Sequence, residues 1–173
     1  RVLFRSITNI GLTAVGSVVI LGLGLLLALA RTTTSASLTP VRILATVYID
    51  FFRGVPLLLV ILLVGFGVPA LRLHGVTKSV LVLGTTAVVL TYTAYVAEVL
   101  RSGILSVHPS QRAAARSLGL TASQTMRHVV LPQAVRRVIP PLLNDLVALL
   151  KDSGLVSILG VIDRSEEHTS ELQ

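Results

Sequence analysis

The chain has 173 residues, of which 53% are hydrophobic and 13% charged, and its formal net charge at pH 7 is +7. Soluble globular domains carry about 25% charged residues, so this composition, with a mean hydropathy of +0.84, predicts a membrane protein. The absence of cysteine excludes disulfides, thiolate metal sites and a cysteine nucleophile. The arginines lie between apolar runs, which indicates cytoplasmic membrane loops and argues against nucleic-acid binding.

The two ends of the chain differ in composition from the residues between them. Residues 164–169 can be encoded by AGATCGGAAGAGCACACG, and the reverse complement of this DNA translates as residues 1–6. The shared DNA resembles a sequencing adapter read at both ends of a fragment. We therefore expect residues 1–6 and 164–173 to be adapter-derived, and we interpret residues 7–163 as a transmembrane domain.

The first apolar run, residues 7–30, contains no charged residue and is rich in Leu, Val and Gly. A helix of about 20 residues crosses the bilayer core, so this run predicts a membrane-spanning helix. A cleaved signal peptide is the alternative. Residues 31–40 predict a polar loop, with Pro40 in the first turn of the next helix.

The second apolar run, residues 43–71, is interrupted by Asp50 and by the segment that contains Arg53, Gly54 and Pro56. Proline removes a helical hydrogen bond and glycine weakens the turn beside it. We therefore predict one kinked spanning helix. Arg53, Gly54 and Pro56 would act as a hinge near the cytoplasmic entrance, or would only fix the kink.

The third span is predicted at residues 79–97, which carry no charge and are followed by Glu98 and Arg101. These two residues are three apart and can meet on one helix face, so we expect a structural ion pair and not a substrate site. Basic residues number three at 31–53, two in the short loop 72–78 and six at 101–137. The positive-inside rule therefore places residues 31–53 and 101–137 on the cytoplasmic side.

The long cytoplasmic loop, residues 102–137, is predicted to contain two helices. The first begins at Pro109 and ends at Gly119, which suits the left-handed conformation of a helix end. Thr121 and Gln124 have the spacing of a capping box, so a second helix begins there and runs back toward the membrane.

The first helix of this loop has the features of a docking element. Small residues at 113–115 would let another surface approach closely. Arg112 and Arg116 are four apart, stand on one face, and could pair with acidic residues of that surface. The alternative is a solvated amphipathic loop that lies at anionic headgroups.

Asn144 and Asp145 lie within the apolar residues 138–150. Polar and ionisable groups in a membrane are costly and usually face a cavity or a partner. They are candidates, together with Lys151 or Asp152, for a translocation pathway. Asp145 could instead pair structurally with a basic residue of a neighbouring helix.

Neither a metal site nor catalysis is expected. His74, His108 and His128 lack the spacing of metal ligands. Lys78 and Lys151 do not follow a glycine, so the chain has no P-loop for ATP. We expect no enzymatic activity and no cofactor bound by this chain.

The spacing of the alanines at 113–115, Gly119 and Leu131-Pro132 resembles the EAA loop of ABC importer permeases. Further motifs follow in the family's order: residues 52–58 (FRGVPLL), 94–98 with Arg101, Gln111, 131–134 (LPQA), 140–142 (PPL) and 151–153 (KDS). Together they resemble the polar amino acid permeases of the histidine and glutamine type, over essentially all of residues 7–163.

The resemblance implies an all-α, multi-spanning type I importer domain of five helices, with about four spans present and a truncated fifth that begins near Leu155. It implies a permease subunit in a prokaryotic plasma membrane that pairs with a second permease subunit, the same or different. ATP and Mg would be bound by ABC ATPase subunits, and an extracytoplasmic solute-binding protein would deliver a polar amino acid.

In this family the first loop helix couples the permease to the ATPase. The residues that the resemblance assigns to the coupling loop are Gln111, Arg112, Ala113, Ala114, Arg116, Gly119, Leu131 and Pro132. The chain departs from the family pattern at Ala113, where a glutamate is usual, at Ser110, where a glycine is usual, and at Ser153-Gly154, where threonine and serine are usual. Two other classes are considered: an ion-gradient-driven transporter or channel with Asp145 as its ion site, and a membrane-anchored structural protein.

Overall fold

The computed structural model describes residues 2–33, 35–72, 75, 77 and 79–170, and the surroundings of side chains 2–14, 81, 153, 155 and 157–170 are not described. Every regular element in the described ranges is helical, which confirms the all-α prediction. The predicted adapter-derived ends, 1–6 and 164–173, lie outside the residues whose side chains are described. Much of the predicted 72–78 loop also lies outside the described residues.

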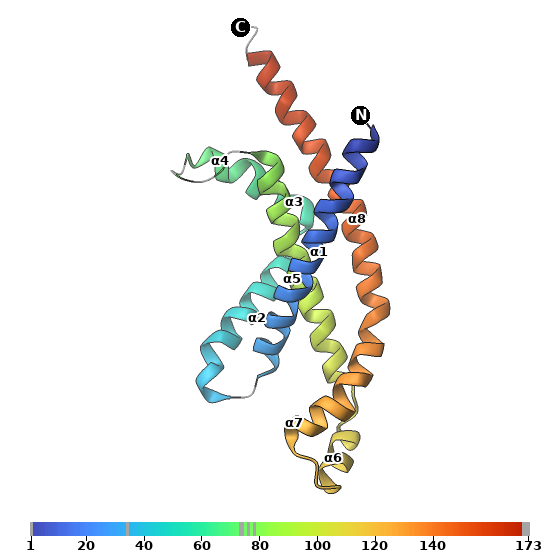
Figure 1. Cartoon of the computed structure of the whole chain (residues 1–173). Helices are drawn as coiled ribbons and strands as arrows, with labels where there is room; N and C mark the ends of the chain where they lie inside the picture. Colours follow the sequence, from blue (N-terminus) through green and yellow to red (C-terminus); the bar gives the residue numbers. More distant parts are fainter. Residues whose placement is uncertain (1, 34, 73–74, 76, 78, 171–173) are drawn as a thin grey trace.

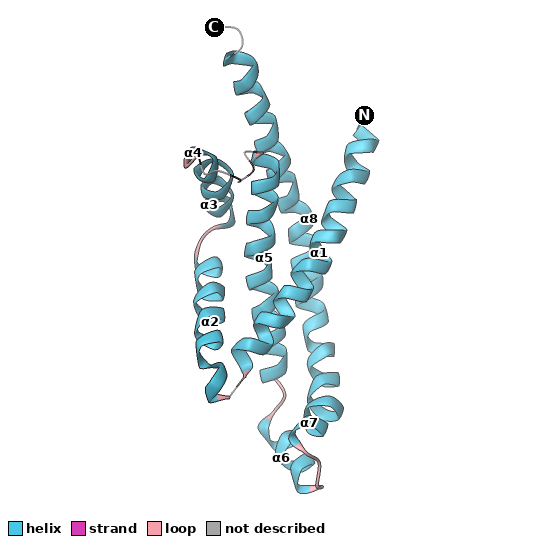
Figure 2. Ribbon diagram, turned by 60° about the vertical axis from the view of Figure 1, so that its left-hand side comes forward, coloured by secondary structure: helices cyan, strands magenta, loops and turns pink. Residues whose placement is uncertain are grey.

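Three long helices form the body of the molecule: α1 (Val2–Thr32), α5 (Val80–Leu105) and α8 (Leu131–Ser170). Helix α5 packs against both of the other two (Figures 1 and 2). It is apolar around most of its circumference, as expected for a helix buried by its neighbours. Ala87, Ala94 and Ala97 of α5 are fully buried, and these small side chains let the flanking helices approach closely.

Helix α2 (Thr39–Gly54) begins with Pro40 in its first turn, as predicted, and packs against α1 and α5. The chain then continues as α3 (Leu57–Leu62), a π-helical turn η2 (Leu63–Gly67) and the short α4 (Val68–Ala70). A short 3-10 helix, η1 (Ala36–Leu38), joins α1 to α2.

The prediction of one kinked helix over residues 43–71 is wrong, because the helix is broken and its two parts differ in direction by 103°. Pro56 has no N–H, and it disfavours helical geometry at the residue before it. Val55 accordingly adopts an extended conformation, with φ −99° and ψ 131°. The hinge residues Arg53, Gly54 and Pro56 therefore surround a break and not a kink.

Two helical segments of the described chain are long and apolar enough to cross a membrane, Val15–Thr32 and Val82–Leu105, and the bent pair could form a third. Helix α8 does not meet this criterion in its described residues, where it carries Asp145, Lys151 and Asp152. The backbone of α8 also continues through Leu155, so the separate fifth helix expected to begin there is not seen.

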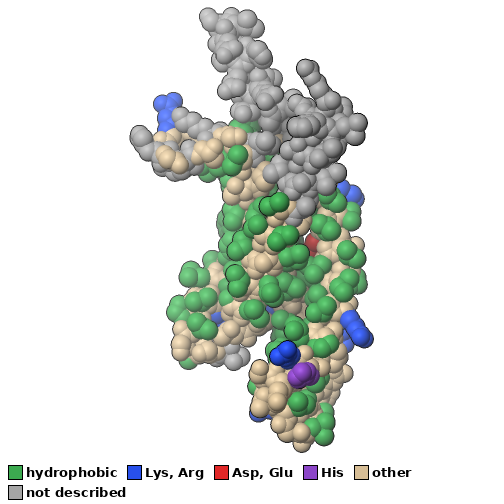
Figure 3. Space-filling view, viewed as in Figure 1, with side chains coloured by type: hydrophobic (Ala, Val, Ile, Leu, Met, Phe, Trp, Pro, Cys, Tyr) green, Lys and Arg blue, Asp and Glu red, His purple; other side chains and the backbone are tan. Residues whose placement is uncertain are grey.

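The long loop between α5 and α8 forms one end of the molecule (Figure 1). It contains α6 (Pro109–Ser117), α7 (Ala122–Thr125) and a π-helical turn η3 (Met126–Val130). In Figure 3 hydrophobic side chains cover much of the long helices, and basic side chains and a histidine are visible at the end that holds α6 and α7. The positive-inside rule predicts that this end lies on the cytoplasmic side of the membrane.

Candidate functional site: the cytoplasmic loop and the cavity beside α8

Helix α6 begins at a well-defined N-cap. The backbone N–H of Ser110 donates to Nδ1 of His108 over 3.2 Å, and Pro109 occupies the first turn. Within α6, Ala115 is buried against the rest of the loop, whereas Ala113 and Ala114 are exposed. The exposed alanines present small side chains on the outer face of α6.

The turn after α6 has the predicted conformation. Gly119 has φ +85°, in the left-handed region that side chains with a Cβ disfavour. Its backbone N–H donates to the carbonyl of Arg116 over 3.0 Å. The capping box is also confirmed: the Gln124 N–H donates to Thr121 Oγ1, and the Thr121 N–H donates to Gln124 Oε1.

Three side chains fasten α6 and the start of α8 to one another and to α5. Nη2 of Arg112 donates to the carbonyl of Ile104 over 2.6 Å. Nε2 of Gln133 in α8 donates to Oε1 of Gln111 in α6 over 2.5 Å, and Nη1 of Arg137 donates to the carbonyl of Ser106. A small buried cluster of Ile104, Val107, Val130 and Ala134 lies beneath these bonds.

The structure thus divides the predicted coupling residues into two groups. Arg112 and Gln111 hold α6 in place. The Arg112 guanidinium is not turned outward as expected, because its Nη2 donates to the carbonyl of Ile104 near the end of α5. Ala113, Ala114, Arg116 and Gly119 are exposed on α6 and its turn, and Leu131 and Pro132 are exposed at the start of α8.

The Glu98–Arg101 pair is part of a larger ionic network. Nη2 of Arg101 lies 2.5 Å from Oε1 of Glu98. Arg31, at the end of α1, reaches Oε2 of Glu98 over 2.9 Å and Oδ1 of Asp50 in α2 over 3.0 Å. Beside it, the Arg53 guanidinium lies 6.0 Å from the ring centre of Tyr95. These contacts join α1, α2 and α5 near the end of α1.

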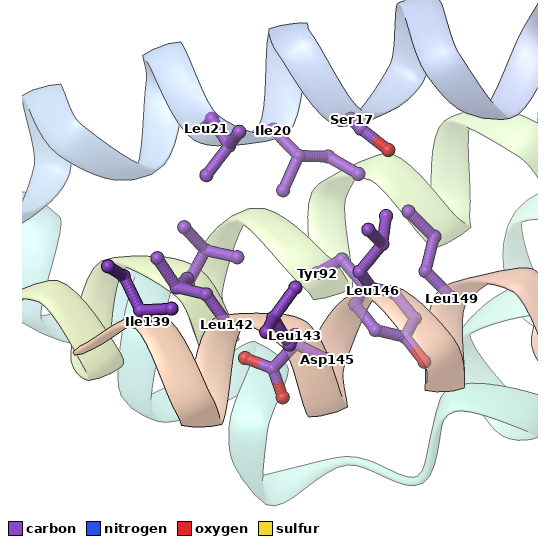
Figure 4. Close-up of a pocket in the computed structure, with 11 residues that line it drawn as sticks. Ser17, Ile20, Leu21, Tyr92, Ile139, Leu142, Leu143, Asp145, Leu146 and Leu149 are labelled. Atoms are coloured by element: carbon purple, nitrogen blue, oxygen red, sulfur yellow. The ribbon is translucent and has the colours of Figure 1, made fainter. Parts of the chain in front are cut away.

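A cavity of about 250 Å³ lies between α1, α5 and α8. Its wall is aliphatic except for Ser17, Tyr92 and Asp145. In Figure 4 the side chains of α1 face the leucines of α8, and Asp145 lies on the side of the cavity away from α1. Oδ2 of Asp145 is buried and has no hydrogen-bond partner. A carboxylate in this position can accept hydrogen bonds from a cationic group.

Of the residues predicted for the pathway, only Asp145 lines this cavity. Asn144 and Lys151 are exposed on other faces of α8. Asp152 accepts a hydrogen bond of 2.6 Å from the hydroxyl of Tyr92, which also lines the cavity. Tyr92 and Arg31 were not singled out from the sequence, because their contacts lie 60 and 67 residues away along the chain.

Within the described residues, no group of three or more His, Asp or Glu side chains could hold a metal ion.

Comparison with known proteins identifies the family. Residues 20–164 match the family described as "Binding-protein-dependent transport system inner membrane component". The chain is 41% identical over 143 residues to the "Probable glutamine ABC transporter permease protein GlnM" of Bacillus subtilis, covering 82% of this chain and 62% of that protein. It is also 41% identical over 147 residues to the "L-cystine transport system permease protein TcyL" of Bacillus subtilis, covering 83% of this chain and 60% of that protein.

A solved structure has the same fold. The "Crystal structure of an amino acid ABC transporter with histidines" matches with a TM-score of 0.76 and 34% sequence identity, over 89% of this chain and 69% of that one. The chain spans about three fifths of the length of the two permease relatives. The family match covers most of the chain, and the long apolar helices agree with a membrane component. This chain therefore belongs to the family of inner membrane components of binding-protein-dependent transport systems.

Proposed function

We propose that the full-length protein is the permease subunit of an ATP-driven ABC importer for polar amino acids in a prokaryotic plasma membrane. The names of the relatives, which include glutamine and cystine permeases, support this substrate class. The observation that carries the proposal is the loop itself: a helix with an exposed face of small residues, ended by Gly119 and fastened to two long helices.

The partners follow from this proposal. Two ABC ATPase subunits would bind ATP and Mg and would receive α6 in a surface groove. A second permease subunit, the same or different, would complete the translocation path, and an extracytoplasmic solute-binding protein would deliver the substrate. This chain would perform no catalysis itself.

The hydrogen bonds of the loop suggest how ATP binding would move the helices. Closure of the ATPase subunits would push α6. The bond from Arg112 to Ile104 would pass this movement to α5, and the contact of Gln111 with Gln133 would pass it to α8. Because Asp145 lies on α8, the wall of the cavity would shift with the loop.

Asp145 is our candidate for the substrate path. Asp145 lines a largely apolar cavity, and one oxygen of its carboxylate is buried without a hydrogen-bond partner. An amino acid carries an ammonium group that could satisfy this oxygen, and a charge-assisted hydrogen bond contributes about 1.5–3 kcal/mol. The ion-gradient alternative would use the same carboxylate, but the ABC permease relatives do not support it.

Uptake by proteoliposomes tests the proposal. The full-length permease would be reconstituted with its ATPase and binding protein, and uptake of labelled glutamine, cystine and histidine would be measured. We expect uptake to require ATP on the side of the membrane where the ATPase subunits lie. We also expect uptake to persist when ionophores dissipate ion gradients. Uptake that is lost with the ionophores and indifferent to ATP would favour the gradient-driven transporter.

A further inference from the structure

A second pocket, of about 300 Å³, opens at the cytoplasmic end of α1, α2 and α5. It is distinct from the cavity beside Asp145 and shares no lining residue with it. Its lining comprises Arg31, Arg42, Ile43, Thr46, Val47 and Arg101. Three helices thus each contribute an arginine to one small space.

The charges around this pocket do not balance. Arg31 and Arg101 share Glu98, and Arg31 also contacts Asp50. In the described part of the chain no carboxylate lies within 4.0 Å of Arg42, whose Nη1 makes only a long hydrogen bond of 3.4 Å to the carbonyl of Thr33. Three guanidinium groups against two carboxylates leave one positive charge in excess. Each guanidinium has five N–H donors, so donors remain for an anion.

The surroundings of the pocket are those of a membrane boundary. Arg31 lies at the end of the apolar segment Val15–Thr32, on the side that the positive-inside rule assigns to the cytoplasm. The adjacent face of α2 is apolar and open: Ile43 is 56% and Val47 is 61% exposed, although both also line the pocket. A basic pocket therefore adjoins an apolar strip.

We propose that this pocket binds the phosphate of an anionic phospholipid from the cytoplasmic leaflet. The planar guanidinium group of arginine can donate two parallel hydrogen bonds to two phosphate oxygens. Basic pockets between spanning helices on the cytoplasmic side of a membrane recognise anionic headgroups. The acyl chains would lie along Ile43 and Val47, which a soluble phosphate would leave exposed. The bound lipid would stabilise the junction of α1, α2 and α5. This proposal does not depend on which substrate is transported.

Native mass spectrometry of the full-length permease in detergent tests the proposal. The protein would be offered phosphatidylglycerol or phosphatidylcholine with identical acyl chains, and the retained lipid would be counted. We expect preferential retention of phosphatidylglycerol. Arg42→Gln should reduce that retention about fivefold, the effect of removing one basic residue near an anionic membrane surface.

Arg136→Gln is the matched control, because Arg136 is exposed on α8 and does not line the pocket. The positive-inside rule assigns it to the same side of the membrane. Arg136→Gln should leave the retention unchanged. Equal losses in the two variants would overturn the proposal, since they would indicate general charge attraction. Displacement of the lipid by inorganic phosphate would overturn the lipid assignment in favour of a soluble anion. The wild-type protein gives a test that needs no variant: equal retention of the two lipids would contradict the proposal.

Discussion

Arg112 of α6 donates a hydrogen bond of 2.6 Å to the backbone oxygen of Ile104 in the last turn of α5. The last carbonyls of a helix have no partner within the helix, so the guanidinium stabilises the end of α5 while it holds α6. Helix α6 is thereby attached directly to the long helix α5.

Replacing Arg112 should weaken the coupling of ATP hydrolysis to substrate uptake more than it weakens assembly of the permease with its ATPase. Arg112→Ala removes a hydrogen bond from a charged group, with a cost of about 1.5–3 kcal/mol, and frees α6 from α5. We expect the reconstituted complex to retain ATP hydrolysis but to lose most substrate uptake, so that the ratio of uptake to hydrolysis falls. Arg127→Ala is the control, because Arg127 is exposed in the same loop and is not one of the predicted coupling residues; the same fall in that variant would show that the Ile104 bond is not responsible.

The packing of α5 against α8 should be sensitive to the size of the side chain at position 103, which is a glycine. A Cβ at this position would lie 2.1 Å from Cγ1 of Val138 and 3.3 Å from the carbonyl of Ala134. Gly103→Ala should therefore destabilise the protein by about 1–3 kcal/mol, the usual cost of overpacking. Thermal unfolding in detergent measures it.

Two further variants make this prediction specific. Gly22→Ala in α1 should be neutral or slightly stabilising, because nothing lies within 4 Å of its added Cβ and alanine favours helix. Adding Val138→Ala to Gly103→Ala should recover part of the loss. Failure of that rescue would indicate that the backbone of Ala134, and not the Val138 side chain, sets the limit.

Glu98 should be the most sensitive member of the ionic network. Its side chain is only 17% exposed and contacts both Arg31 and Arg101. Glu98→Gln would leave these guanidinium groups underpaired and should cost about 3 kcal/mol, as for other largely buried pairs. Asp50→Asn should cost less than about 1 kcal/mol, because Asp50 is 56% exposed. Chemical unfolding in detergent compares the two, and equal losses would contradict the difference in burial.

Asp145 should matter for transport and not for folding. The buried Oδ2 of Asp145 makes no hydrogen bond that a substitution could remove. Asp145→Asn should therefore leave the unfolding temperature unchanged or raise it. Uptake should fall tenfold or more, given about 1.5–3 kcal/mol for a charge-assisted hydrogen bond to the substrate. Asn144→Ala, at an exposed neighbour, should transport normally. Normal uptake by Asp145→Asn would remove Asp145 from the path.

The local structure of the loop follows closely from its sequence. The left-handed Gly119 and the capping box of Thr121 and Gln124 were predicted, and both are present. Each depends on residues within one helical turn, where backbone conformation and side-chain hydrogen bonds are set by residue type.

Features that depend on contacts between distant segments could not be predicted. Pro56 indicates an interruption, but the 103° bend depends on how α3 packs against α5. Arg31 was counted only as a loop charge, although it pairs with Glu98, 67 residues away. The direction of the Arg112 side chain depends on free carbonyls of another helix. The sequence does carry one signal for this network: Arg31, Asp50 and Glu98 all lie near the predicted cytoplasmic ends of their apolar runs.

The most direct test of the account is whether the loop binds an ABC ATPase through the turn at Gly119. The measurement is co-purification of the ATPase subunit with full-length permease that carries Gly119→Val, compared with Gly75→Val. Both glycines have nearly the same left-handed φ, +85° and +83°, and nothing lies within 4 Å of an added Cβ at either. Both variants therefore carry the same backbone strain of about 1–2 kcal/mol, but Gly75 lies in the opposite loop. We predict that Gly119→Val loses the ATPase while Gly75→Val retains it; full retention by Gly119→Val would contradict the role of this loop as the coupling element.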